Sequence, residues 1–143
     1  MIDFSRENQV LGAVAIEEWG FLYHCMKAVP PDQQLLVNFR QVPKWQGIQN
    51  LLTLGTVSET MDSNWQKISG EVNFDCDRIS PGNRILWDSR SHGSMVFALP
   101  PAGWKKALAS LRKMGFTEAT LVGHLRSQGA SPKVVLSDWQ APN

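Results

Sequence analysis

The stretch "SHGSMVFALPP", residues 91–101, constrains the fold of this chain more than any other segment. A polar loop containing a glycine precedes an apolar run, and two prolines end that run. An apolar run of this length between turn residues is typical of a buried strand. Pro101 also suits the first turn of a helix. The sequence therefore predicts a polar loop, a buried strand over 94–99 and a helix that follows at once.

Hydrophobic periodicity predicts the other elements. Helices are expected over 21–29, 45–54 and 102–114, and strands over 34–40, 119–123 and 133–137, with a short strand near 71–74. The helix over 102–114 should turn Leu108, Leu111 and Met114 inward, and Gly55 and Gly115 should end two of the helices. Residues 8–16 fit a strand or a helix, and the rest of 56–83 is polar and irregular. This alternation predicts an α+β sandwich.

Composition limits the classes of function. The chain has 143 residues, of which 43% are hydrophobic and 19% charged, so we expect one globular domain over 1–143. Fourteen basic and thirteen acidic residues give a net charge of +1, which provides no general attraction to nucleic acid or to a membrane. Cys25 and Cys76 lack metal-ligand spacing and are expected to be reduced thiols. With no signal peptide or membrane span evident, a cytoplasmic location is expected.

Residues 85–125 contain a series of motifs that resembles a known family. In order they are Asp88, a small polar loop, Gly93-Ser94, the apolar run, Pro100-Pro101, an amphipathic helix and Val122-Gly123-His124-Leu125. The series is similar to the last conserved block of selenophosphate synthetase. More broadly, it resembles the carboxy-terminal domain shared with aminoimidazole ribonucleotide synthetase. In that family a Gly-Gly pair occupies the position of Gly93-Ser94.

The similarity extends upstream and covers about residues 10–137. The segment "GAVAIEEWGFLYHCMKA" aligns without gaps on the synthetase stretch T-D-V-T-G-F-G-L-L-G-H and keeps three residues of it. These are Gly20, Leu22 and His24. A following block keeps Val42-Pro43, Gly47, Leu51, Gly55 and Asn64 at corresponding places. The resemblance implies a three-layer α+β domain with a mixed sheet, partly similar to a ferredoxin fold.

The same resemblance implies lost chemistry. The amino-terminal domain, which carries the family's catalytic cysteine or selenocysteine and its lysine, has no counterpart, and the chain starts inside the carboxy-terminal domain. The family aspartate that helps to bind metal and nucleotide falls on Ala15, and Glu17 and Glu18 add negative charge nearby. The second glycine of the Gly-Gly pair is Ser94. We therefore expect no intact ATP site, no catalytic residue, no bound metal and no cofactor.

Two loops remain candidate binding sites. Ser89, Arg90, Ser91, His92, Gly93 and Ser94 are expected to bind a small anion, or to form a polar turn without a ligand. Glu17, Glu18, Trp19 and Gly20 form the second, degenerate loop. There the two carboxylates are either repurposed as ligands or an acid/base pair, or solvated at a helix start.

Histidines and tryptophans suggest weaker hypotheses. His24, His92 and His124 form a metal cluster only if the fold gathers them, and packing is the expected role of His24. Trp19, Trp65 and Trp104 are either anchors for a partner surface or core residues.

The leading hypothesis is a non-catalytic, synthetase-like domain that acts through protein contacts and forms a homo-oligomer. The truncated domain would leave a sheet edge for another chain to cover. The alternative is a nucleotide- or phosphate-binding module that completes an ATP-dependent, selenophosphate synthetase-like site on a partner chain. An independent hydrolase or phosphotransferase is disfavoured because no nucleophile and base stand at a recognisable spacing.

Overall fold

The computed structural model describes residues 2–43, 46–56, 58–75, 81–88, 90, 94–127 and 131–138. The helices are α1 (Ile2–Glu7), α2 (Phe21–Ala28), α3 (Gln46–Thr53), α4 (Met61–Ile68) and α5 (Trp104–Lys113), with a 3-10 helix η1 (Pro81–Trp87). The strands are β1 (Gly12–Ala15), β2 (Gln33–Asn38), β3 (Val72–Asp75), β4 (Met95–Ala98), β5 (Gly123–Ser127) and β6 (Val134–Ser137). The expected α+β class is confirmed.

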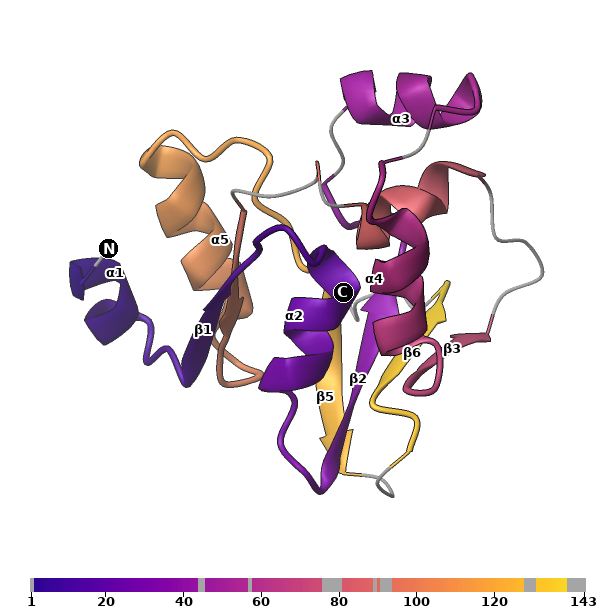
Figure 1. The fold of residues 1–143 in the computed structure, drawn as a ribbon. Coiled ribbons are helices and arrows are strands. Elements are labelled where there is room, and N and C mark those ends of the chain that lie inside the picture. The colour runs from indigo at the N-terminus through magenta and orange to yellow at the C-terminus, as the bar shows by residue number, and fades with distance from the viewer. Residues whose placement is uncertain are drawn as a thin grey trace.

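The strands form two sheets (Figure 1). In sheet A, β1 pairs with β4 antiparallel, with Ala13 opposite Phe97. In sheet B the strand order is β3-β6-β2-β5. There β2 is parallel to β6, β6 is parallel to β3, and β5 runs antiparallel to β2. Sheet B is therefore mixed, as the sequence predicted.

The core lies between sheet B and the helices α2 and α4, which cover one of its faces (Figure 1). Its most deeply buried members come from five elements. They are Leu22 of α2, Val37 of β2, Ile68 of α4, Ile85 and Leu86 of η1, and Val134 and Leu136 of β6. Full burial of a side chain of this size contributes about 1.5–3 kcal/mol. Packing of these apolar stripes therefore positions α2 and α4 on the sheet.

Most of the expected elements are confirmed to within a few residues. The helices over 21–29 and 45–54 correspond to α2 and α3, and the strands over 34–40 and 133–137 to β2 and β6. The segment 8–16, which fitted a strand or a helix, contains β1. Gly55 and Gly115 follow α3 and α5 with φ of 84° and 99°. This left-handed conformation favours glycine, as expected where a helix ends.

Two predictions about burial were wrong. The strand expected to be buried is β4, and none of its residues is buried; Met95 is 50% exposed. One face of β4 meets the core through Val96, whereas Met95 lies on the other face and stays open to solvent. In α5, Ala107 is buried, whereas Met114, expected to face inward, is 50% exposed.

Further differences concern where elements lie. The strand expected over 119–123 begins only at Gly123, as β5. Gly123 lies so close to Leu36 that an added Cβ would collide with the carbonyl oxygen of Leu36. This close pairing with β2, which no local pattern encodes, sets the position of β5. Helices α1 and α4 and the 3-10 helix η1 were not predicted, although α4 buries Met61 and Ile68 at helical spacing.

Cys25 is expected to resist alkylation in the folded protein. Burial raises the pKa of its thiol from 9.0 to about 12, so the reactive thiolate is scarce near neutral pH. Iodoacetamide at pH 8 should label Cys25 only after unfolding in urea, as measured by peptide mass spectrometry. Equal labelling rates in the folded and unfolded protein would contradict this assignment. Cys76 lies outside the described residues.

The same shift predicts a dependence of stability on pH. The unfolded thiol loses its proton near pH 9, whereas the folded thiol keeps it until about pH 12. The contribution of the protonated Cys25 thiol to the free energy of unfolding is therefore complete below pH 9. It is lost as the pH rises towards 12, at up to about 1.4 kcal/mol per pH unit. A Cys25→Ala variant should show a shallower loss above pH 9 in urea denaturation.

Candidate functional site

The structure brings the two candidate loops together. Residues 17–20 follow β1, and Asp88, Arg90 and Ser94 precede β4. Because β1 and β4 are antiparallel, both loops lie at one end of sheet A. The backbone N–H of Ile16 donates to the carbonyl oxygen of Ser94 at 2.8 Å. Ser89, Ser91, His92 and Gly93 lie outside the described residues, so the described part of the loop over 89–94 comprises Arg90 and Ser94, and Asp88 directly precedes this loop.

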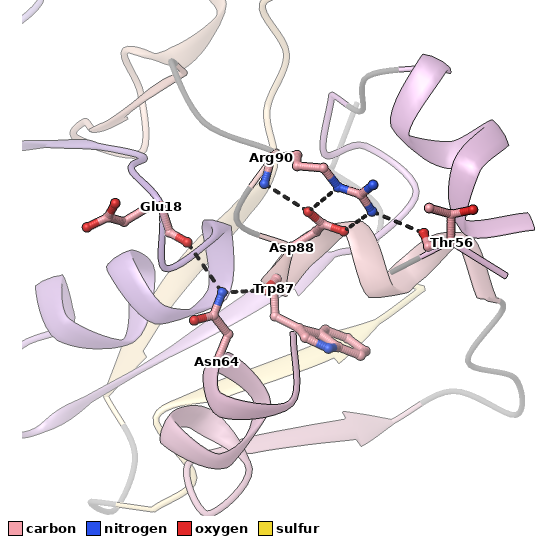
Figure 2. A network of polar contacts seen from close by, with 6 residues as sticks. All are labelled: Glu18, Thr56, Asn64, Trp87, Asp88 and Arg90. Carbon is pink, nitrogen blue, oxygen red and sulfur yellow. Dashed lines mark hydrogen bonds and ion pairs between the residues drawn. The ribbon is translucent and has the colours of Figure 1, made fainter. Parts of the chain in front are cut away.

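An ion pair between Asp88 and Arg90 lies at the centre of the site (Figure 2). Nε of Arg90 donates to Oδ1 of Asp88 at 2.9 Å, and Nη2 donates to Oδ2 at 2.7 Å. The backbone N–H of Arg90 also donates to Oδ1, at 2.8 Å. The Asp88 side chain is 0% exposed and that of Arg90 is 27% exposed. Two parallel charge-assisted bonds make this one of the stronger kinds of ion pair.

Arg90 of this pair also forms a hydrogen bond to the segment that follows α3. Nη2 of Arg90 donates to the carbonyl oxygen of Thr56, just after α3, at 3.2 Å. The hydrogen bond to Asp88 raises the pKa of Arg90, so the guanidinium stays charged. Most of the donors of Arg90, expected to bind an anion, are therefore engaged by Asp88 and Thr56. Nη1 has no hydrogen-bond partner within the described part of the chain.

Asn64 of α4 joins the two candidate loops (Figure 2). Its Nδ2 donates to the carbonyl oxygen of Trp87 at 3.0 Å and to that of Glu18 at 3.3 Å. The residue is 2% exposed. Asn64 was not among the predicted site residues, although the family resemblance includes it. The signal that could have revealed it is a polar residue inside the buried stripe that also contains Met61 and Ile68.

The loop over 17–20 contributes backbone atoms, and not carboxylates, to the contacts of the site. The side chains of Glu17 and Glu18 are exposed, and Figure 2 shows the Glu18 carboxylate pointing away from Asn64. The Trp19 ring stacks on Tyr23 with centroids 5.3 Å apart, and Nζ of Lys67 lies 3.9 Å from its centroid. Gly20 is buried against the backbone of Trp87. The binding role expected for Gly20 stays a prediction, whereas its close packing against Trp87 is observed.

Within the described residues, no three His, Cys, Asp or Glu side chains gather in a way that would hold a metal ion. His24 packs edge-on against Tyr23 at 5.3 Å, and its buried Nε2 has no hydrogen-bond partner there. His124 lies on β5, where burial and the neighbouring charge of Arg126 lower its pKa. His92 lies outside the described part. The described part of the site therefore contains a network of hydrogen bonds that joins the two loops. Nη1 of Arg90 remains able to donate a hydrogen bond to an anion.

No model of a known protein family matches this chain, and no curated protein sequence matches it. No helix among the described residues has the length and the apolar character that crossing a membrane would require. Function has therefore to be inferred from the residues and their geometry.

Proposed function

We propose that the chain is a non-catalytic, synthetase-like domain that acts through protein–protein contacts and self-associates through sheet A. The observation that carries this proposal is the state of that sheet. Within the part of the chain that the structure describes, sheet A consists of β1 and β4, and none of their residues is buried. A two-stranded sheet is marginally stable alone in water. Both strands are edges, and open edges are templates for pairing with another chain.

The outward face of sheet A is apolar. Val14 and Val96 lie opposite each other and pack against the core. Because side chains alternate along a strand, Ala13, Ala15 and Met95 lie on the other face. Both alanines are exposed, and Met95 is 50% exposed. Further along this face, Phe97 contacts Phe4 of α1 with centroids 5.3 Å apart.

The edges of sheet B differ from those of sheet A. Its edge strands β3 and β5 contain charged residues, Asp75 and Arg126 respectively. Charged side chains on edge strands oppose pairing between molecules. The sequences of β1 and β4, GAVA and MVFA, contain no charge. We therefore assign self-association to sheet A rather than to sheet B.

The resemblance to selenophosphate synthetase supports the non-catalytic part of the proposal. The two segments that resemble conserved stretches of that family are neighbours in space, joined by Asn64 and by the contact between Ile16 and Ser94. Ala15, at the place of the family's metal-binding aspartate, has no side chain that could coordinate a cation. The two neighbouring carboxylates, of Glu17 and Glu18, are exposed to solvent.

Sedimentation velocity tests self-association. We expect the wild-type chain to shift from monomer towards dimer as its concentration rises to tens of micromolar. An Ala13→Lys variant should remain monomeric, because the charge would have to be desolvated at the new interface. Ala109→Lys, the same exchange at an exposed position of α5, should associate like the wild type. A strictly monomeric wild type, or equal behaviour of the two variants, would refute the proposal.

One observation favours the alternative, a phosphate- or nucleotide-binding module that completes a site on a partner chain. The two candidate loops converge, and Nη1 of Arg90 has no partner among the described residues. Calorimetry with ATP, with and without Mg²⁺, discriminates the two functions. Saturable heat from a protein that stays monomeric would favour the alternative. Absence of heat from a protein that dimerises would favour protein contacts.

A further inference from the structure

A hollow of about 310 Å³ lies beyond the carboxyl end of β2, away from the loops described above. It is lined by residues 40–43, by residues 117–120 and by Arg112 in the last turn of α5. In sheet B, Asn38 is level with Ser137, and Ser137 is level with Asp75. The parallel strands β2, β6 and β3 therefore end at one edge.

The two walls of the hollow are held together by hydrogen bonds. The backbone N–H of Asn38 donates to the carbonyl oxygen of Val122 at 2.8 Å. The Asn38 side chain, in a residue that is 3% exposed, accepts the backbone N–H of Arg40 at 3.0 Å. Between the two walls, Oγ1 of Thr120 donates to Oε1 of Gln41 at 3.2 Å. The hollow is thus preformed, which reduces the entropy lost when a ligand binds.

Two arginines, Arg40 and Arg112, are among the residues that line this space. Nη2 of Arg112 donates to the carbonyl oxygen of Ala119 at 3.2 Å, an uncharged partner that leaves the positive charge in place. Nε of Arg40 lies 2.9 Å from Oδ1 of Asp138, but these side chains are 69% and 57% exposed. An ion pair so exposed is weak and yields readily to a competing anion. The single carboxylate among the lining residues belongs to Glu118.

We propose that this hollow binds the oxyanion group of a small molecule, a phosphate or a carboxylate, between Arg40 and Arg112. The planar fork of a guanidinium matches both groups through paired N–H···O bonds. The backbone and hydroxyl groups of residues 117–120 add neutral polar contacts. The volume is at the lower end of that of small-molecule sites, about 300–1,000 Å³. The occupant is therefore a small anion rather than a whole nucleotide.

Proton–nitrogen NMR titration tests the site. Inorganic phosphate and succinate are added separately, with ionic strength held constant by chloride. We expect saturable shifts of the backbone amides of residues 117–120. The anion that saturates at the lower concentration identifies the preferred group. Arg112→Gln should weaken binding by about tenfold or more, the loss expected for one charged hydrogen-bonded contact.

The matched control is Arg6→Gln, which removes an exposed arginine of α1, outside the hollow. It should leave the affinity unchanged. Each variant is first compared with the wild type by spectral dispersion and melting temperature, so that a folding defect is not read as lost binding. Shifts that grow linearly without saturation would overturn the proposal. So would unchanged affinity in Arg112→Gln, or equal losses in the two variants. Because Arg112 lies outside sheet A, these outcomes are independent of self-association.

Discussion

Replacing Arg90 by methionine is expected to lower the free energy of unfolding by about 3 kcal/mol. The Asp88 side chain is 0% exposed, and among the described residues the exchange leaves it one donor, the backbone N–H of residue 90. A buried charge without its partner costs about 3–5 kcal/mol. We expect the lower end of that range, because the Arg90 side chain is 27% exposed and water can enter the space it vacates.

Urea denaturation followed by tryptophan fluorescence measures this effect, since Trp87 lies beside the pair. The matched control is Arg40→Met, which breaks the exposed ion pair with Asp138 and should cost less than about 1 kcal/mol. The double exchange Asp88→Asn with Arg90→Met should recover part of the loss, because it removes the unpaired charge. If Arg90→Met is no more harmful than Arg40→Met, the Asp88–Arg90 pair does not join these segments as described.

Gly20→Ala is expected to destabilise the protein by a similar amount, about 3 kcal/mol. Gly20 has φ of 85° and ψ of 169°, a conformation that is essentially restricted to glycine and costs other residues about 1–3 kcal/mol. A Cβ atom there would also lie 2.7 Å from Cα of Trp87. Since that atom belongs to the backbone, it cannot move aside as a side chain could. Overpacking of this kind adds about 1–3 kcal/mol.

Gly12→Ala is the control for Gly20→Ala. An added Cβ at Gly12 meets nothing within 4 Å. This exchange should therefore be neutral or slightly stabilising, because alanine restricts the unfolded chain more than glycine does. Thermal unfolding followed by circular dichroism gives both values. Equal melting temperatures of the two variants would show that Gly20 does not require its unusual backbone or its close contact with Trp87.

Several parts of the fold could be predicted because their signals are local. The apolar stripe of α2 and the glycines after α3 and α5 lie within a few residues of the structures they determine. Helix α4 escaped prediction for a local reason as well. Asn64 occupies its buried stripe, and a polar residue there interrupts the apolar period. Asn64 is tolerated because two distant backbone carbonyls accept its N–H groups.

The candidate site was predictable only in part. The sequence indicated both loops, and Arg90 and Gly20 within them, but it left open whether the loop of Arg90 binds an anion or forms a polar turn. The structure pairs Arg90 with Asp88 and places Gly20 against Trp87. The hollow beside Arg112 had no signal in the sequence. Its walls come from segments far apart in the chain, and Val42-Pro43, the part of them that the family resemblance includes, suggested no binding role.

By itself, the sequence determined the α+β class and the ends of the helices that stop at glycine, because periodicity and backbone freedom act over short ranges. Only the tertiary structure decided which faces are buried and which segments meet. The apolar run of β4 stays unburied because its second face lies away from the core, and β5 begins at Gly123, where Leu36 of β2 approaches closely. Burial and close approach depend on partners distant in sequence, and no local pattern specifies those partners.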